Sequence, residues 1–233
     1  MTALSTSVAI DLVRKNLDEI DPNGSIMYNS ENGSSADFTE NKSLELTIKR
    51  SLPEAINAVH LAAPVELLDW EDDDATPASV SVDSDTQKIL TFTLAANYDF
   101  LRLVAFKATD SDIVVTNVIP QASVEGRKQA NKYIRGQYDR PRLVREQGTA
   151  SDAAVKFHYY SLKSAYSGLT PGVMIEFVRI IKKQEYDSSA TSYNISYRVK
   201  QNIIDYLTAL VLEVYSDQRA QVYYQKASIY PSI

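Results

Sequence analysis

The stretch NKYIRGQYDRPRLVR, residues 131–145, places five basic side chains and two tyrosines within fifteen positions. Arginine and lysine at this density can hold phosphate or carboxylate groups, because each offers several N–H donors around a positive charge. Three interpretations are open: a contact with nucleic acid, a dock for an acidic protein, and an ordinary solvated face. Residues 127–145 contain seven bases and one acid, a formal charge of +6. The bases are Arg127, Lys128, Lys132, Arg135, Arg140, Arg142 and Arg145, and the acid is Asp139.

The chain as a whole is acidic, with a formal net charge of -6 over 233 residues. This charge opposes non-specific attraction to DNA, so any nucleic-acid role must be local. Residues 65–125 hold twelve acids and three bases, a formal charge of -9. Two zones of opposite charge favour self-association, in which the basic zone of one copy meets the acidic zone of the next. Such head-to-tail contacts close into a ring when the rotation between copies allows it.

The charge pattern therefore predicts that the basic segment contacts protein. The residues that we expect at an interface between subunits or rings are Arg135, Arg140, Arg142 and Arg145. The alternative is direct binding of nucleic acid by residues 127–145, with Tyr133 and Tyr138 as stacking partners for bases.

A second candidate interface lies at the C-terminus, in VYYQKASIYPSI, where Tyr223, Tyr224 and Tyr230 follow an apolar helix. Tyrosine buries apolar area while it keeps a polar tip, so we expect this tail to dock onto another protein. The alternative is a tail that folds back onto its own helix.

No catalytic motif accompanies these segments. The sequence lacks G-x-x-x-x-G-K-[ST], G-x-G-x-x-G, G-x-S-x-G and H-E-x-x-H, and it has no cysteine. His60 and His158 lie in apolar periodic segments, where a hydrogen-bonded core or boundary imidazole is expected. The acidic run 71–74 lacks the alternating ligands of a calcium loop, so we expect a solvated loop. The sequence predicts a protein that is not an enzyme and that binds no cofactor and no metal.

Helical periodicity marks both ends of the chain. Ile10, Val13 and Leu17 predict a helix that residues 21–24 end, followed by a loop to residue 41. Leu44, Ile48 and Leu52 predict another helix. Ser51 and Pro53 then predict a kink or a restart near Ser51, with a second helix over residues 53–61. Residues 196–230 predict the longest helix, because they have apolar side chains at three- and four-residue intervals and no internal Gly or Pro before the end.

β-Branched runs mark the middle of the chain. Residues 79–83, 89–95, 112–119, 142–146, 154–162 and 173–186 predict strands. Between them, residues 123–136 predict a helix with Val124, Ala130 and Ile134 on one face and Gly136 as its stop. No run approaches about eighteen apolar residues, and the N-terminal segment lacks a leader pattern, so we expect a soluble, intracellular chain.

These elements predict an α+β fold, in which both chain ends build a helical part around a β-rich insertion. We expect the N-terminal part of the helical domain over residues 1–74, the insertion with a short helix over 75–189, and the C-terminal long helix and tail over 190–233.

Residues 44–64 and 205–227 resemble the helices of the head-to-tail connector adaptors of tailed bacteriophages, in which helices flank a variable β-containing insertion. The N-terminal VRKNLDEIDPNGSIMYNSEN is similar to ring proteins of crAss-like phages. The β-rich middle departs from the compact adaptors, since it is long and is divided by a predicted helix.

The resemblance implies a non-enzymatic virion protein that forms a ring of identical copies, commonly a dodecamer. Its implied partners are its own copies, the portal, and a neighbouring connector ring or tail protein. DNA would pass through the channel without tight specific binding, no membrane would be involved, and assembly would take place in the host cytoplasm. A DNA channel works better with a weakly repelling wall than with an adhesive one, which agrees with the acidic net charge.

Overall fold

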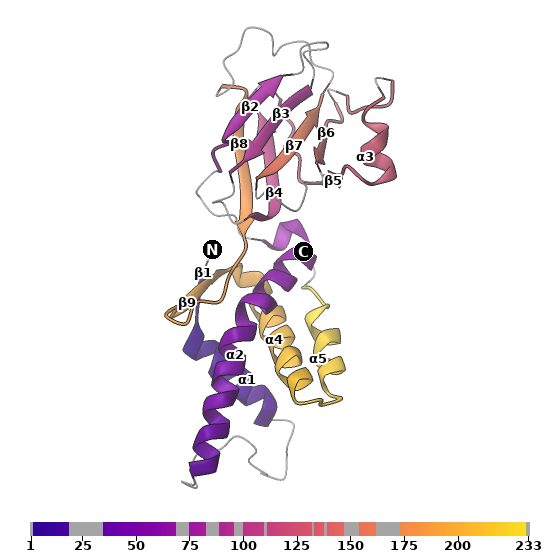
Figure 1. The fold of residues 1–233 in the computed structure, drawn as a ribbon. Coiled ribbons are helices and arrows are strands. Elements are labelled where there is room, and N and C mark those ends of the chain that lie inside the picture. The colour runs from indigo at the N-terminus through magenta and orange to yellow at the C-terminus, as the bar shows by residue number, and fades with distance from the viewer. Residues whose placement is uncertain are drawn as a thin grey trace. The chain divides into compact units, whose positions relative to one another are not determined.

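The computed structural model describes residues 2–18, 35–68, 75–82, 89–95, 100–109, 111–131, 133–137, 139–146, 154–161 and 173–231. The chain forms two compact units, one from residues 1–69 with 183–233 and the other from residues 70–182. The first unit is mainly helical and the second holds most of the strands (Figure 1). This confirms the α+β class with a helical part built from both chain ends. The divisions at 69/70 and 182/183 compare with expected divisions at 74/75 and 189/190.

In its described residues, the helical unit contains four α-helices, two 3₁₀ turns and a two-stranded antiparallel sheet. These are α1 (Thr6–Asp18), α2 (Ser35–Ala62), α4 (Lys200–Val214), α5 (Ala220–Ala227), η2 (Val65–Leu67), η5 (Tyr197–Val199), β1 (Thr2–Ser5) and β9 (Ser192–Ile195). Within the described residues, no helix has the length and apolar character required to cross a membrane.

Helix α2 is continuous, so the predicted restart near Ser51 is wrong, as is the extent of the predicted loop to residue 41. Pro53 lies inside the helix and removes one backbone hydrogen bond, a cost of about 3 kcal/mol. The helix continues because its apolar stripe is unbroken on both sides of the proline. That stripe is buried and comprises Leu44, Ile48, Leu52, Ala55, Ile56 and Val59. The burial of several such side chains, at roughly 1.5–3 kcal/mol each, outweighs the lost bond.

The predicted final helix is two helices, α4 and α5, and α2 is longer than either. Helix α4 ends at Val214, and Ser216, two residues further on, has a positive φ of 56°. The amide of Ser216 donates to the Glu213 carbonyl, and the amide of Asp217 donates to the Leu212 carbonyl. This pair of bonds is a Schellman motif, which usually has glycine where Ser216 stands. Because position 216 is not glycine, the sequence pattern does not predict the end of this helix.

The β-rich unit contains a five-stranded sheet and a two-stranded sheet. The larger sheet has the order β2 (Ser79–Val82), β3 (Ile89–Leu94), β7 (Val155–Tyr160), β6 (Arg142–Arg145), β5 (Val118–Pro120). The smaller sheet pairs β4 (Phe100–Ala108) with β8 (Ile175–Lys182) in an antiparallel manner. All pairings in the larger sheet are antiparallel except β5 with β6, which is parallel.

An aromatic cluster joins the two sheets in one core. Phe92 of β3 stacks on Phe106 of β4 with ring centroids 5.0 Å apart, and on Phe157 of β7 at 5.1 Å. Tyr159 of β7 lies 5.0 Å from Phe106. All four rings are buried. Strand β3 alternates buried and partly exposed residues, which leaves Thr91 on the face of the sheet opposite to the cluster.

Strand prediction failed where the alternation is broken or the strands are short. Strand β4 was missed because three register shifts interrupt its pairing with β8 and disturb the period of two. The four-residue strands β1 and β9 were also missed, since each depends on a partner far away in the sequence. The predicted strand over residues 112–119 is mostly irregular: Val115 forms an isolated bridge to Phe106, and β5 begins only at Val118.

The helix predicted over residues 123–136 is also wrong beyond its first turn. Helix α3 covers only Val124–Lys128, and turns follow it. The supposed buried face is exposed, with Val124 at 66% and Ile134 at 52%. Gly136 does not end a helix. A Cβ atom there would lie 2.6 Å from the Tyr160 carbonyl oxygen and 2.7 Å from the Arg142 nitrogen, so glycine is required by close packing.

The left-handed conformation of Ser216 leads to a stability prediction. Replacing Ser216 with glycine should raise the free energy of unfolding by about 1 kcal/mol, because glycine adopts a positive φ without steric cost. Ser228, which has a φ of -84°, is the matched control, and Ser228→Gly should lower stability. Denaturant titration of both variants measures the two changes, and a loss of stability in Ser216→Gly would contradict the assignment.

Candidate functional site, a basic crossover connection

The basic segment lies on the connection between the parallel strands β5 and β6. Parallel neighbours cannot be joined by a tight hairpin, so the chain must cross from the end of β5 to the beginning of β6. That crossover contains α3 and residues 129–141, at the edge of the five-stranded sheet (Figure 1).

Side-chain hydrogen bonds hold this crossover against the sheet. The Ser123 hydroxyl accepts a bond from the Gly126 amide at 3.0 Å and so caps α3. The buried side chain of Gln129 accepts a bond from the Gly136 amide at 2.7 Å and donates to the Glu125 carbonyl at 3.3 Å. Gln129 therefore links α3 to the segment that follows it. No sequence signal distinguished this glutamine from a surface residue.

The tip of the crossover is a tight turn. Gln137 and Arg140 exchange backbone hydrogen bonds of 3.2 and 3.0 Å, which fixes the turn that carries Asp139. Lys132 and Tyr138, two residues singled out from the sequence, lie outside the described residues. Tyr133 is 77% exposed.

The four predicted interface arginines have different surroundings. Arg140 has 84% of its side chain exposed and lies 4.0 Å from Asp139. Arg142 lies 3.7 Å from Glu125, with 42% of its side chain exposed. Arg145 places its guanidinium 5.1 Å from the centre of the Phe100 ring.

Arg135 differs from the other three because its Nε is buried without a hydrogen-bond acceptor among the described residues. Its charge lies near Tyr160: burial raises the pKa of the Tyr160 hydroxyl, and the positive charge of Arg135 opposes that shift. An arginine with an unused buried donor can gain a hydrogen bond when a ligand supplies an acceptor.

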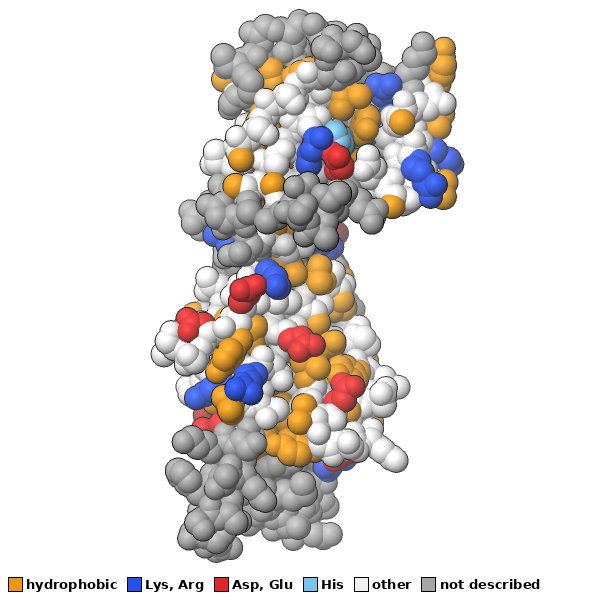
Figure 2. Space-filling view, in the orientation of Figure 1, with side chains coloured by type: hydrophobic (Ala, Val, Ile, Leu, Met, Phe, Trp, Pro, Cys, Tyr) orange, Lys and Arg blue, Asp and Glu red, His pale blue; other side chains and the backbone are white. Residues whose placement is uncertain are grey.

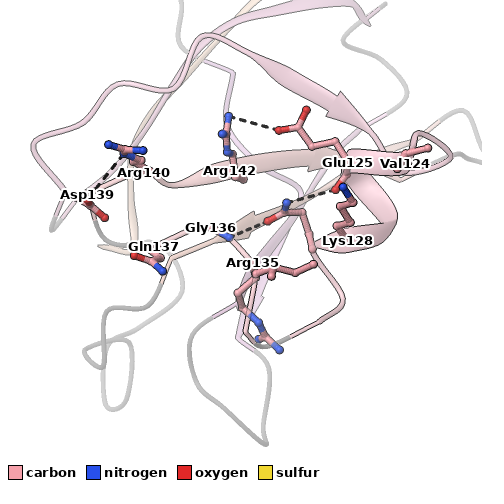
Figure 3. Close-up of a pocket in the computed structure, with 11 residues that line it drawn as sticks. Val124, Glu125, Lys128, Arg135, Gly136, Gln137, Asp139, Arg140 and Arg142 are labelled. Carbon is pink, nitrogen blue, oxygen red and sulfur yellow. Dashed lines mark hydrogen bonds and ion pairs between the residues drawn. The ribbon is translucent and has the colours of Figure 1, made fainter.

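Three of these arginines and Lys128 line a pocket of about 590 Å³. Glu125 and Asp139 also line it, which leaves two more bases than acids. In Figure 3, Arg142 points toward Glu125, Arg140 lies beside Asp139, and Arg135 extends away from both. The exposed apolar side chains of Val124 and Ile134 also line it. The pocket therefore offers cations on several sides together with an apolar patch, a combination that suits an extended acidic segment.

A polar cluster on the outer face of the large sheet was not expected from the sequence. His158 lies 3.0 Å from the Thr91 hydroxyl through Nδ1 and 3.0 Å from Glu146 Oε2 through Nε2. The Lys156 ammonium also contacts Glu146 Oε2, at 2.8 Å. Figure 2 shows a histidine on the β-rich unit beside a basic and an acidic side chain. The hydrogen bond from Lys156 lowers the pKa of Glu146 most strongly, and the one from His158 adds to it, against the opposite effect of desolvation.

Both histidines occupy the hydrogen-bonded positions expected of them. His60 is buried, and its Nε2 accepts a bond from the Ser196 amide at 3.4 Å. The acidic run 71–74 lies outside the described residues, so its expected solvation stays a prediction. No group of three or more potential metal ligands occurs in the part of the chain that the structure describes.

The C-terminal tyrosines contact their own unit. Tyr223 is buried and donates to the Asn16 carbonyl at 3.2 Å, so it is a core residue and is not available as a docking anchor in this fold. Tyr224 donates to Glu213 and packs edge-on against Tyr206 at 5.1 Å. Tyr230 is partly exposed.

The tail also folds back onto α4. The Asn202 amide donates to the carbonyls of Ala227 and Ile229, both at 2.9 Å. These bonds favour the alternative in which the tail packs on its own helix. The exposed apolar side chains at this end are Val222 and Ile229, with exposures of 51% and 72%. Any contact with another protein would use them before it used Tyr223.

The chain matches no known protein-family model and no curated protein.

The Glu146 cluster leads to a pH prediction. Because the folded-state pKa of Glu146 lies below its ordinary value of 4.5, its contribution to stability is present above that value and is lost as the pH falls through the lowered pKa. Glu146→Gln should therefore destabilise the protein by roughly 0.5 kcal/mol near neutral pH, a small value because the side chain is 34% exposed. The difference from wild type should vanish in acid.

Thermal unfolding of Glu146→Gln and wild type across the pH range measures this effect. The matched control is Glu185→Gln, which removes an exposed carboxylate paired with Lys183. A deficit in Glu146→Gln that stays constant down to low pH would contradict the linkage.

The Asn202 bonds lead to a second stability prediction. Asn202→Ala should cost about 2 kcal/mol, because two carbonyls lose their donor and one of these bonds is buried. Asn202→Asp should be comparably harmful, since an ionised carboxylate cannot donate. Gln201→Ala, which removes one partly buried bond to Asp205, is the control and should cost less. Denaturant titration compares the three, and a silent Asn202→Ala would show that these two bonds contribute nothing to stability.

Proposed function

We propose that this chain is a non-enzymatic structural protein that assembles with copies of itself into one ring of a phage head-to-tail connector, around the channel through which DNA passes. The observation that carries the proposal is the concentration of exposed cations on one braced crossover, in a chain with a net charge of -6. The sequence resemblance of residues 44–64 and 205–227 to connector adaptors supports the same assignment. The site of action would be the virion.

The physical argument concerns where positive charge is useful. A wall that lines a DNA channel must let phosphates slide past, and clustered arginines there would retain them. The same arginines at a protein contact steer the approach of an acidic surface and fix its register. The partners would be neighbouring copies, the portal, and an adjacent ring or tail protein.

The exposed apolar residues of the helical unit also support the proposal that the protein assembles with other proteins. Tyr197, Leu61 and Ile229 are each more than half exposed. Together with Val222, they provide apolar area that a neighbouring protein could cover.

The proposal predicts a salt-sensitive oligomer. The variant Arg140→Glu/Arg142→Glu/Arg145→Glu should raise the dissociation constant of the assembly about tenfold or more. This corresponds to a loss of roughly 1.4 kcal/mol of binding free energy. Higher salt should weaken the wild-type assembly too, since exposed charges are screened beyond about 8 Å at physiological ionic strength. Light-scattering mass measurements and electron-microscope images of rings provide the readout.

The matched control is Lys15→Glu/Arg50→Glu/Lys183→Glu, which changes the net charge equally at three exposed positions of the helical unit. This control should assemble like wild type, and thermal unfolding should show that both variants are folded. A wild-type mass that is monomeric at every salt and protein concentration would refute the proposal.

Nucleic-acid binding by residues 127–145 is the second candidate function, and the exposed ring of Tyr133 favours it. The two candidates differ in their response to DNA. A connector ring should bind duplex DNA weakly at physiological salt, whereas a packaging accessory should bind tightly with a steep dependence on salt. A tight complex that Tyr133→Ala and Arg140→Glu both weaken would replace the first candidate with the second.

A further inference from the structure

The pocket at the crossover has features that select its occupant. Its bases lie on different sides, with Arg135 directed away from Arg140 and Arg142 (Figure 3). A single compact anion could not reach all of them at once. An extended ligand with several separate carboxylates could.

The existing ion pairs leave these bases available. The closest approaches of Arg140 to Asp139 and of Arg142 to Glu125 are 4.0 and 3.7 Å, longer than a charge-assisted hydrogen bond. Arg135 also has a buried Nε without an acceptor among the described residues. A carboxylate that enters the pocket would therefore add hydrogen bonds without breaking strong ones.

The pocket also has an apolar part. Val124 is 66% exposed and Ile134 is 52% exposed, and both line it. Exposed apolar side chains beside clustered cations are the complement of an aromatic side chain flanked by acids.

One segment of the chain has this composition. Residues 69–74 read DWEDDD, which is five acids around the only tryptophan of the protein. It is the densest acidic run in a sequence whose other acids are scattered.

We infer that residues 69–74 of one copy bind the pocket lined by Lys128, Arg135, Arg140 and Arg142 on the next copy. This inference rests on the proposed self-assembly and names the contact that carries it. Carboxylates pair with the bases, and the indole of Trp70 covers Val124 and Ile134. A contact between two different surfaces is heterologous, so its repetition from copy to copy closes a ring when the rotation between copies allows it.

Reciprocal charge reversal tests the contact. The pocket variant Lys128→Glu/Arg140→Glu makes the pocket acidic and changes two exposed residues without a short ion pair. The segment variant Asp72→Lys/Asp73→Lys/Asp74→Lys changes the formal charge of the run from -5 to +1. Neither variant should assemble alone, because like charges then face each other across every contact.

An equimolar mixture of the two variants should assemble. In an alternating ring, the acidic segment of the pocket variant meets the basic pocket of the segment variant, and the reversed segment meets the reversed pocket. A single chain that carries all five changes should also assemble. The mass distribution by light scattering reports each case, and we expect at least a tenfold loss of affinity in the single variants and recovery in the mixture.

The remaining outcomes separate the inference from the proposed function. If wild type and both variants form identical rings, the ring stands and the inferred contact is wrong. If the five-change chain recovers but the mixture does not, the segment binds within its own chain and the inference is overturned. If only the pocket variant fails, the pocket binds another partner. A monomeric wild type refutes the proposed function and the inference with it.

Discussion

The parallel pairing of β5 with β6 is the constraint on which the candidate site depends. An antiparallel pair would need only a short hairpin, whereas a parallel pair requires the chain to return to the same end of the sheet. That return path contains α3 and the basic segment. Because β6 also pairs with β7, and β7 contributes Phe157 and Tyr159 to the aromatic core, the base of the crossover is fixed by the most buried part of its unit. The exposed arginines are thus carried by a rigid support.

Local interactions then determine the shape of the crossover. Gln129 connects α3 to Gly136, and Gly136 lies so close to Tyr160 and Arg142 that no larger residue fits without a shift. The polar cluster around Glu146 ties the end of β6 to β7 on the outer face of the sheet. The bases near the tip therefore project from a short turn with two anchored ends. Such an arrangement holds charges at defined positions, which a contact with fixed register requires and which non-specific attraction does not.

Sequence reasoning predicted the class of fold because class depends on hydrophobic periodicity, which is local. The apolar stripe from Leu44 to Val59 and the alternation in Ile89–Leu94 could both be recognised in the sequence. Sequence reasoning failed where tertiary packing overrode a local signal, as at Pro53. It also failed where an unusual residue filled a standard role, as Ser216 does after the end of α4. For the candidate site, composition located the basic segment but not its form. The connection from β5 to β6 and the role of Gln129 depend on pairings between distant residues, which no single window of sequence contains.

Both candidate interfaces expose apolar side chains other than those that the sequence pattern selects. Val124 and Ile134 have the spacing of a buried helical face, yet the structure exposes both beside the cations. The converse holds at the C-terminus, where the aromatic Tyr223 is buried in its own unit and Val222 is exposed instead. In both places the side chains with unsatisfied apolar area differ from those that composition alone selects. Burial of that area is worth about 25 cal/mol per Å², which favours association with another protein over exposure to water. The basic crossover combines such area with charges that a purely apolar contact would lack, and this combination is why it is the stronger of the two candidate interfaces.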